Sequence, residues 1–326
     1  MRKRRENVYL DNGATSFPKA PGVGEAMCQY IERVGRNVGR GSYAPAMDAA
    51  GQVLSVREKL QKLVNAPSSR NVLFTPGATW GLNLLLHGLL RPGDKVLTSP
   101  MEHNAVLRPL EQLKARGVEV ELLPCTGRGE LSLDGLEEKL TSNIRAVVLT
   151  HASNVSGNLF PIGTVGRLCR ARGIFFLVDA AQTLGALPVD MADMGIDGLA
   201  FPGHKGLLGP QGIGGLAVTD ALAAELEPLV SGGTGSMSES LHMPPFLPDK
   251  LEPGTLNLPG IMGLGAALDY LAEQGEELRQ RERKLARHLW YRLKELDGEG
   301  LRVLGSDDPY NRMGVVSVDF THGDNA

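Results

Sequence analysis

The sequence predicts an α/β protein with a mainly parallel central sheet that is covered by helices on both faces. Short β-rich runs recur along the 326 residues, and helix-length amphipathic stretches separate them. Several of these runs are apolar throughout, as strands are when helices cover both faces of a parallel sheet. Alternating strands and helices of this kind are typical of βαβ crossovers.

Each predicted strand is a short run rich in apolar and β-branched residues. These strands are 71–75, 95–98, 118–123, 146–150, 174–179, 197–201 and 214–218. The predicted helices between them are 78–90, 105–116, 133–140 and 162–172. Most of these helices end at glycine or at Pro-Gly, because neither residue continues a helix well (Pro92, Gly93, Gly117 and Gly173).

The last part of the chain has a different pattern. Residues 261–296 have a helical pattern with alternating charges on one face, and Gly275 is a point at which this helix could be interrupted. Two strands, 301–304 and 314–320, follow it. We therefore expect a large domain of residues 17–258 and a smaller α+β domain of residues 1–16 and 259–326, whose C-terminal part we expect to be missing.

The composition is that of an ordinary soluble globular protein, with 42% hydrophobic and 22% charged residues. A formal charge of −3 does not favour binding to nucleic acid or to an anionic membrane. Three widely spaced cysteines cannot form a disulfide framework, which indicates a reducing compartment. No apolar segment follows the basic residues 1–5, so we interpret them as a solvated tail and expect a cytoplasmic protein.

Several standard motifs are absent from the sequence. It contains no G-x-x-x-x-G-K-[ST] phosphate loop and no G-x-G-x-x-G after a first strand. The seven histidines include no H-E-x-x-H pair, and we expect no metal site. No G-x-S-x-G turn marks a nucleophilic serine, although spacing alone does not exclude a Ser/His/Asp triad.

Polar residues at strand ends are the best candidates for a site, because ligands of such sheets bind beyond the carboxyl ends of the strands. Asp179 ends the apolar strand 174–179, although aspartate at this position is also a common helix N-cap. Lys205 lies in the glycine-rich segment 201–210, where burial would lower the pKa of its amine and make it nucleophilic. The alternative for Lys205 is a solvated loop lysine.

Three further polar segments follow strands. Residues 76–79 open a helix, where backbone N–H groups and the Thr79 hydroxyl form a natural phosphate cradle or simply a helix start. Residues 101–104 place His103 at the same sheet edge, and residues 151–157 follow another strand. A strand-end acid, a lysine 26 residues later, a phosphate cradle and a histidine together match the chemistry of pyridoxal 5′-phosphate (PLP).

With these segments, the sequence resembles the class V aminotransferase family of PLP enzymes, and within it the cysteine desulfurases and selenocysteine-lyase-like proteins. The segments that carry the resemblance occur in family order and are 8–15, 74–79, 101–103, 151–155, 178–182, 203–205 and 252–257. The resemblance covers essentially the whole chain. It implies the fold of the fold-type I PLP-dependent transferases, with PLP as the cofactor.

The resemblance implies a role for each matching residue around the cofactor ring. Lys205 would hold the aldehyde of PLP and later move the α-proton of the substrate, and Asp179 would pair with the pyridine nitrogen. Gln182 would hydrogen-bond the phenolic oxygen, and Asn154 would lie beside it. His103 would stack on the ring and is a candidate for moving protons.

A second group of residues would hold the phosphate of the cofactor. Gly77, Ala78 and Thr79 would form the cradle, and His204 would assist them. By the same resemblance, Thr255 would reach the phosphate of a partner subunit, which implies a homodimer with shared active sites.

The chain departs from the family pattern in two places. Pro202 stands where many relatives have a serine or threonine, so it offers no hydroxyl to the phosphate. Relatives also continue past the last strand into a loop with an arginine and the cysteine that attacks the sulfur of the substrate, and nothing in this sequence corresponds to that loop. Cys28, Cys125 and Cys169 match no such position, and we interpret them as structural.

The resemblance implies a PLP-dependent cysteine desulfurase-like enzyme, which converts L-cysteine to L-alanine and passes the sulfur on as a persulfide. Without the cysteine loop, this chain is expected to bind PLP but to be poor or inactive in persulfide formation. Alternatives are a selenocysteine lyase, another PLP-dependent lyase or aminotransferase, and a non-catalytic dimerising accessory protein. The expected partners are cysteine or selenocysteine, a second copy of the chain and a sulfur-acceptor protein, with neither nucleic acid nor a membrane.

Overall fold

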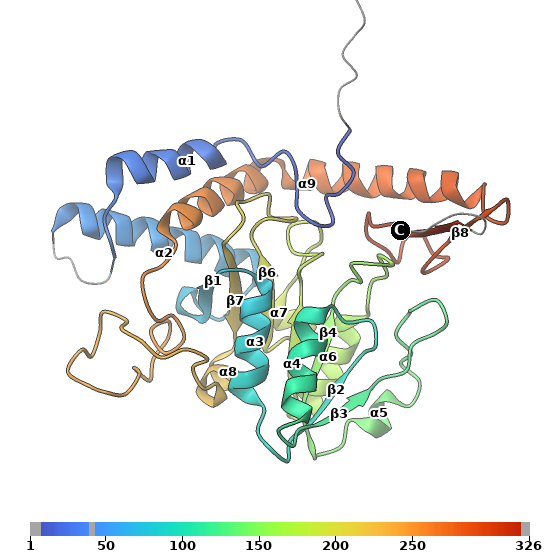
Figure 1. The fold of residues 1–326 in the computed structure, drawn as a ribbon, viewed down its shortest axis with the longest axis horizontal. Coiled ribbons are helices and arrows are strands. Elements are labelled where there is room, and N and C mark those ends of the chain that lie inside the picture. The colour runs from blue at the N-terminus through green and yellow to red at the C-terminus, as the bar shows by residue number, and fades with distance from the viewer. Residues whose placement is uncertain (1–7, 39–42, 321–326) are drawn as a thin grey trace, which may run out of the picture.

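The computed structural model describes residues 8–38 and 43–320 (Figure 1). Within these residues the main sheet has seven strands in the order β1-β7-β6-β5-β4-β2-β3. β7 is antiparallel to both of its neighbours, and the other neighbouring pairs are parallel, which confirms the predicted mainly parallel sheet. The strands are β1 (Val72–Thr75), β2 (Lys95–Thr98), β3 (Glu119–Leu122), β4 (Ile144–Thr150), β5 (Phe175–Asp179), β6 (Gly198–Pro202) and β7 (Gly214–Val218).

Helices cover both faces of this sheet (Figure 1). α3 and α4 pack against one face, and α2, α6 and α9 pack against the other. A π-helical turn, Tyr30–Val34, continues α1, and a 3₁₀ turn, Ser69–Asn71, precedes β1. The helices are α1 (Val23–Gln29), α2 (Ala44–Val64), α3 (Ala78–Leu89), α4 (Asn104–Lys114), α5 (Leu136–Lys139), α6 (Ile162–Ala171), α7 (Met191–Met194), α8 (Asp220–Glu225) and α9 (Leu258–Lys294).

Alternating side chains along the strands build a separate apolar core on each face of the sheet. In β4, Val147 and Leu149 belong to the cluster formed with α2, α6 and α9, whereas Val148 between them belongs to the cluster formed with α3 and α4. All three are fully buried, because successive side chains of a strand point to opposite faces. Both faces are therefore filled, and the strand ends are left for polar contacts.

The 21-residue helix α2 was not among the predicted elements. Its buried residues include Ala49, Val53, Val56 and Leu60, which recur at spacings of three and four positions. Such spacing places side chains on one face of a helix. The signal for α2 was therefore present in the sequence.

The predicted interruption at Gly275 is wrong, because α9 runs without a break over 37 residues. Gly275 is buried within α9 and stands between good helix formers such as Ala272 and Glu276. A glycine in a helix interior costs about 1 kcal/mol relative to alanine. The packing of α9 against α1 and α2 offsets this cost.

A two-stranded antiparallel sheet of β8 (Leu301–Val303) and β9 (Val318–Phe320) lies near the C-terminal end of α9 (Figure 1). The predicted strands 301–304 and 314–320 are thus confirmed in part, since residues 314–317 lie outside β9. The division into domains after residues 16 and 258 stays a prediction. Its terminal parts, residues 1–7 and 321–326, lie outside the described residues.

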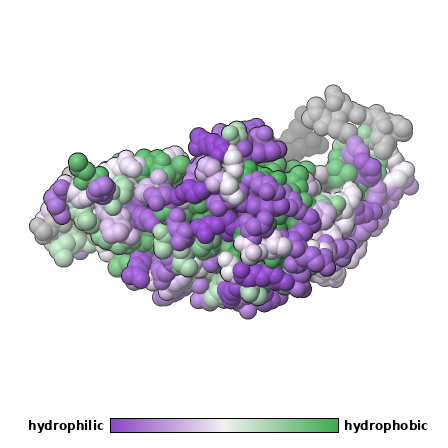
Figure 2. All heavy atoms as spheres, turned by 90° about the horizontal axis from the view of Figure 1, so that it is seen from below, coloured by the Kyte–Doolittle hydropathy of each residue, from purple (hydrophilic) through white to green (hydrophobic). Residues whose placement is uncertain are grey.

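Figure 2 shows the molecule from below the view of Figure 1, and hydrophilic residues cover most of this face. No helix within 8–38 and 43–320 is both long enough and apolar enough to cross a membrane. The basic residues 1–5, interpreted above as a solvated tail, lie outside the described residues.

Candidate active site

The carboxyl ends of the parallel strands lie along one edge of the sheet. Asp179, the last residue of β5, pairs in register with Thr150, the last residue of β4. Farther along the sheet, Pro202 at the end of β6 and Thr75 at the end of β1 both pair with Gly214 of β7. The segments that follow these strands therefore start from a common edge.

The side chain of Asp179 is buried at this edge, with 3% of the residue exposed. Its Oδ1 accepts a hydrogen bond from the Ala181 N–H at 2.8 Å, and Oδ2 has no partner within the described residues. This bond closes a turn and does not cap a helix, since α7 begins only at Met191. Burial raises the pKa of the carboxyl group, and Ala181, His103 and Lys205 oppose that shift. A cation at Oδ2 would offset the cost of burying the carboxylate.

Lys205 lies in a tightly packed loop, residues 203–209, that follows β6. Gly206 has no room for a side chain, because a Cβ atom there would lie 2.5 Å from the carbonyl oxygen of Leu184. Leu208 has a left-handed backbone conformation with φ of 57°, and its N–H donates to the carbonyl oxygen of Lys205 at 2.8 Å. Burial lowers the pKa of the Lys205 amine, and Asp179 partly opposes this shift. The amine has no hydrogen-bond partner among the described residues, so it is available to a ligand.

A short N-terminal segment holds the same loop from another side. The carbonyl oxygen of His204 accepts hydrogen bonds from the Ser16 N–H at 3.0 Å and from Lys19 Nζ at 2.9 Å. The Ala20 N–H donates to the carbonyl oxygen of Leu208 at 3.0 Å. Sequence patterning did not find these contacts, because no local pattern relates residues such as Ser16 and His204, which are 188 positions apart.

His103 and Gln182 are held by backbone groups near the site. His103 precedes α4, and its Nδ1 accepts a hydrogen bond from the Ala105 N–H at 3.0 Å, which leaves Nε2 for other contacts. Gln182 Nε2 donates to the carbonyl oxygen of Gly13 at 3.1 Å. The remaining N–H and the amide oxygen of Gln182 are left for a ligand.

The N-terminus of α3 supplies backbone N–H groups close to the end of β6. Gly77 is the N-cap residue, and no side chain of the described residues caps it. A Cβ atom on Gly214 would lie 2.9 Å from Gly77 Cα, and Gly214 pairs with Pro202. No atom lies within 4 Å of a Cβ atom built on Gly77. Free N–H groups, the open space and the exposed Thr79 side chain suit a phosphate group.

Asn154 and His204 lie on loops that other parts of the chain hold in place. Asn154 is exposed in the loop after β4, where Ser317 Oγ donates to the carbonyl oxygen of Val155 at 2.6 Å. His204 is half-buried, and its Nδ1 lies 3.0 Å from Thr15 Oγ1. The backbone of the Asn154 loop and the side chain of His204 are therefore held by contacts that are distant in the sequence.

Arg312 binds the Asn154 loop from inside. Its guanidinium group is buried and donates to the carbonyl oxygens of Ser156 at 2.8 Å and Ser306 at 3.2 Å. Gly157 in this loop has φ of 74°, and a Cβ atom there would lie 2.3 Å from the carbonyl oxygen of Val315. This close packing requires glycine at position 157.

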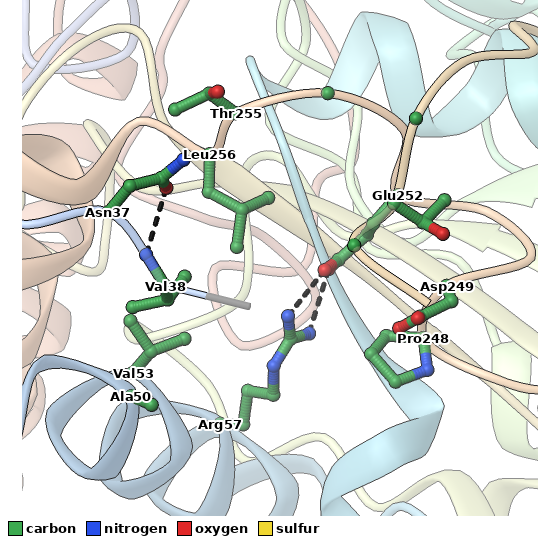
Figure 3. Close-up of a pocket in the computed structure, with 14 residues that line it drawn as sticks. Asn37, Val38, Ala50, Val53, Arg57, Pro248, Asp249, Glu252, Thr255 and Leu256 are labelled. Atoms are coloured by element: carbon green, nitrogen blue, oxygen red, sulfur yellow. Dashed lines mark hydrogen bonds and ion pairs between the residues drawn. The ribbon is translucent and has the colours of Figure 1, made fainter. Parts of the chain in front are cut away.

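Thr255 lies in a separate cavity of about 380 Å³ (Figure 3). The residues that line this cavity include Arg57 of α2 and Glu252, and none of the other predicted site residues. Arg57 and Glu252 form a buried ion pair, drawn with dashed lines in Figure 3. Glu252 also accepts a hydrogen bond from the Phe74 N–H.

Two buried titratable residues near Asp179 were not candidates from the sequence. Glu102 Oε1 accepts a hydrogen bond from the Ser99 hydroxyl at 2.6 Å, and burial raises the pKa of Glu102 to about 8. Burial lowers the pKa of His151 to about 4, and its Nδ1 has no partner among the described residues. Both residues are therefore mostly neutral at pH 7 and add little charge beside Asp179.

The donor set at this edge fits a flat aldehyde that carries a ring nitrogen and a phosphate. Lys205 offers a half-buried amine with a lowered pKa, and the buried residue Asp179 offers an oxygen, Oδ2, that has no hydrogen-bond partner among the described residues. The start of α3 offers free N–H groups with open space before them. Pro202 has no hydroxyl, so phosphate binding would depend on α3 and on neighbouring loops.

Comparisons of the sequence agree on one family. The family model described as aminotransferase class-V matches residues 8–326. A probable cysteine desulfurase of Methanothermobacter thermautotrophicus is 35% identical over 324 residues, and the match covers 98% of this chain and 80% of that protein. A cysteine desulfurase of Escherichia coli O157:H7 is 34% identical over 323 residues, with coverage of 96% and 78%.

Solved structures support the same assignment. The apo structure of a cysteine desulfurase from Thermococcus onnurineus NA1 matches with a TM-score of 0.88 and 30% identity, and the match covers 97% of this chain and 79% of that chain. The S-sulfonic acid form of the cysteine desulfurase CsdA from Escherichia coli matches with a TM-score of 0.83 and the same identity and coverage. The chain therefore belongs to the class-V aminotransferase family and, within it, to the cysteine desulfurase branch.

Proposed function

We propose that this protein is a PLP-dependent cysteine desulfurase. The observation that carries the proposal is the combination of a half-buried Lys205 amine with a lowered pKa and a buried Asp179 carboxylate whose Oδ2 has no hydrogen-bond partner within residues 8–38 and 43–320. The relatives named cysteine desulfurase support L-cysteine as the substrate.

PLP, when bound, supplies an electron sink that weakens the Cα–H bond of an attached amino acid. Asp179 would hold a proton on the ring nitrogen, because a buried carboxylate favours a cation beside it. Lys205 would bind the aldehyde carbon and, once its amine is free again, would take the Cα proton. Its lowered pKa increases the share of neutral amine that can accept this proton.

The residues around the ring would orient the bound substrate. His103, held by the Ala105 N–H, would lie over the ring with Nε2 free. Gln182, held by the carbonyl oxygen of Gly13, would use its second N–H on the phenolic oxygen, with Asn154 beside it.

A separate group would hold the phosphate. The backbone N–H groups of Gly77, Ala78 and Thr79, the Thr79 hydroxyl and the His204 ring are the proposed ligands. The positive end of the α3 dipole would add to the attraction for the negative phosphate.

The proposed reaction converts L-cysteine and a thiol into L-alanine and a persulfide. The Cβ–Sγ bond of cysteine breaks, its sulfur bonds to the sulfur of the acceptor thiol, and Cβ gains a proton. The acceptor sulfur is oxidised as Cβ is reduced, so no external oxidant or reductant is required. A thiol is the only co-reactant.

The test is covalent trapping of PLP followed by turnover. Protein incubated with PLP is reduced with borohydride, digested and mapped by mass spectrometry. We expect the label on Lys205, no visible absorption band in Lys205→Ala, and a normal band in the control Lys59→Ala, which changes a surface lysine. L-Cysteine with dithiothreitol as an external thiol should then give L-alanine and sulfide, but only slowly, because Cys28, Cys125 and Cys169 do not match the position of the attacking cysteine. Absence of label on Lys205 would overturn the proposal, and alanine from L-selenocysteine alone would favour a selenocysteine lyase.

We also propose a homodimer in which Thr255 of each chain completes the phosphate site of the other. Thr255 is exposed and lies in a cavity that none of the other predicted site residues lines, and both observations support this proposal. Sedimentation should give twice the monomer mass, and Thr255→Ala should weaken PLP binding without changing that mass. A wild-type protein that sediments as a monomer would contradict the proposal. A Thr255→Ala variant that binds PLP as tightly as the wild type does would also contradict it.

Two further predictions belong to this proposal. The large domain of residues 17–258 and the small domain of residues 1–16 and 259–326 are supported by the two separate sheets, and limited proteolysis near residue 258 tests the division. A cytoplasmic, reducing location is supported by three free cysteines, Cys28, Cys125 and Cys169.

A further inference from the structure

We propose that Lys19 is a positioning residue for Lys205, and that it acts through the carbonyl group of His204. The inference rests on the proposed function, because it takes Lys205 as the lysine that binds the cofactor. It adds a residue of the N-terminal segment to the machinery of the site.

The ammonium group of Lys19 makes three hydrogen bonds and no ion pair within the described residues. Nζ donates to Thr15 Oγ1 at 3.0 Å, to Ser16 Oγ at 3.2 Å and to the carbonyl oxygen of His204 at 2.9 Å. These bonds use all three donors of an ammonium group. Burial lowers the pKa of Lys19, which shows that holding this cation here has a cost. Burying a cation without an acidic partner costs free energy, so stabilising a surface segment does not by itself explain a lysine at this position.

The carbonyl oxygen that Lys19 binds belongs to the peptide group that joins His204 to Lys205. The same oxygen also lies within hydrogen-bond distance of the Ser16 N–H and Ser16 Oγ, both at 3.0 Å, and of Thr15 Oγ1 at 3.2 Å. Among the donors that the described residues supply to this oxygen, Lys19 is the charged one, and hydrogen bonds to charged groups are roughly twice as strong as neutral ones. Lys19 is therefore the strongest single restraint on this peptide group.

The opposite side of the loop cannot compensate for a movement of this peptide. Gly206 packs directly against the Leu184 carbonyl, and Leu208 is held in a left-handed conformation. With those contacts fixed, the His204 carbonyl sets where the Lys205 backbone lies, and with it the reach of Nζ. A displacement of about 1 Å at a reacting group can cost about 100-fold in rate.

The charge of Lys19 also reaches the proposed phosphate ligand. Burial lowers the pKa of His204, and the charges of Lys205 and Lys19 lower it further. His204 Nδ1 lies 3.0 Å from Thr15 Oγ1, which is itself a partner of Lys19. Lys19 thus contacts the His204 residue through both its carbonyl oxygen and its side-chain partner.

The experiment compares Lys19→Met, Lys19→Arg and the control Lys59→Met in the full chain. The first readout is the dissociation constant for PLP, followed by the visible band and by borohydride trapping on Lys205. We expect Lys19→Met to bind PLP about tenfold more weakly, the effect of losing one charged hydrogen bond. Lys19→Arg, which keeps charge and donors, should recover most of this loss, and Lys59→Met should bind as the wild type does.

The second readout does not need the cofactor. Hydrogen–deuterium exchange of the protein without PLP should be faster at residues 203–209 in Lys19→Met, and unchanged in the strands of the main sheet. Equal PLP affinity and equal exchange in Lys19→Met and wild type would overturn the inference, as would a failure of Lys19→Arg to recover the loss. If Lys19→Met does not fold, the same comparison is made with Lys19→Gln, which keeps a donor but no charge and should retain part of the affinity. A wild-type protein that binds no PLP refutes the proposed function, whereas the exchange data still decide the role of Lys19.

Discussion

Replacing Glu252 with glutamine removes the negative charge that faces Arg57 in the cavity of Figure 3. The change is small in volume, and the glutamine oxygen can still accept the hydrogen bond from the Phe74 N–H. What is lost is the charge opposite a guanidinium group that also packs over the Phe74 ring, with Arg57 Cζ 4.5 Å from the ring centroid. The Glu252→Gln variant therefore leaves a buried cation without its partner.

The burial of the pair sets the size of the effect. The side chains of Arg57 and Glu252 are 8% and 4% exposed, so water screens the lost charge very little. Removing one partner from such a buried pair costs about 3–5 kcal/mol. Lys59, two residues farther along α2, pairs with Asp269 at 35% and 61% exposure, and breaking that exposed pair costs about 0–1 kcal/mol. The same helix thus provides a matched control, Lys59→Met.

The assay is urea unfolding at pH 7 followed by circular dichroism. With an m-value of about 3 kcal/mol/M, Glu252→Gln should lower the midpoint by about 1–1.7 M, and Lys59→Met should lower it by less than about 0.4 M. The double variant Arg57→Met/Glu252→Gln should be more stable than the sum of the two single losses predicts. If Glu252→Gln lowers the midpoint no more than Lys59→Met does, the burial argument is refuted.

Three other substitutions, the first with a matched control, test packing, hydrogen bonding and titration. Gly166→Ala should destabilise the protein by about 1–3 kcal/mol, because the added Cβ atom would lie 1.9 Å from the Met194 carbonyl oxygen. The control Gly163→Ala, in the same helix, would place its Cβ atom no closer than 3.4 Å to any other atom, and it should change stability by less than about 1 kcal/mol. Thermal unfolding measures both changes. Arg312→Met should lower the free energy of unfolding by about 1.5–3 kcal/mol in the same assay, because it leaves the carbonyl oxygens of Ser156 and Ser306 without this donor. A decrease of less than about 0.5 kcal/mol would contradict the stabilising role of Arg312. Burial raises the pKa of Glu102 from 4.5 to about 8, so the folded state of the wild type loses stability as the pH rises between these values. Glu102→Gln lacks this titration, and its stability relative to wild type should rise by up to about 1.4 kcal/mol per pH unit in that range. A stability difference that does not change with pH would argue against this assignment.

The parallel sheet could be predicted from sequence because its signals are local. The strand ending at Asp179 is an apolar run, and the loop with Lys205 follows a second run and is marked by glycines. Each feature lies within about ten residues of sequence. The rule that the carboxyl ends of parallel strands share one edge of the sheet then predicts that these features lie close together. The continuity of α9 through Gly275 was missed because packing outweighs the local cost of one glycine.

The contacts that surround the candidate site could not be read in the same way. Arg57 is a charged residue of the kind expected on the surface of a helix. Only the fold shows that it is buried and pairs with Glu252, 195 positions away. Lys19 follows Pro18 in a segment without periodicity, so nothing local relates it to His204. Such residues belong to two segments at once, and a pattern within one segment cannot reveal the other.

The bond between Thr15 and the His204 backbone also has a consequence for the order of events during synthesis. The two residues are 189 positions apart, so at about 5–20 residues per second the ribosome makes His204 about 10–40 s after Thr15. During that interval the N-terminal segment has no lysine loop to bind, and Phe17 within it stays exposed even in the finished fold. Thr15 can therefore bind the His204 backbone only after about 189 further residues have been made, and the proposed cofactor site is complete only after that contact has formed.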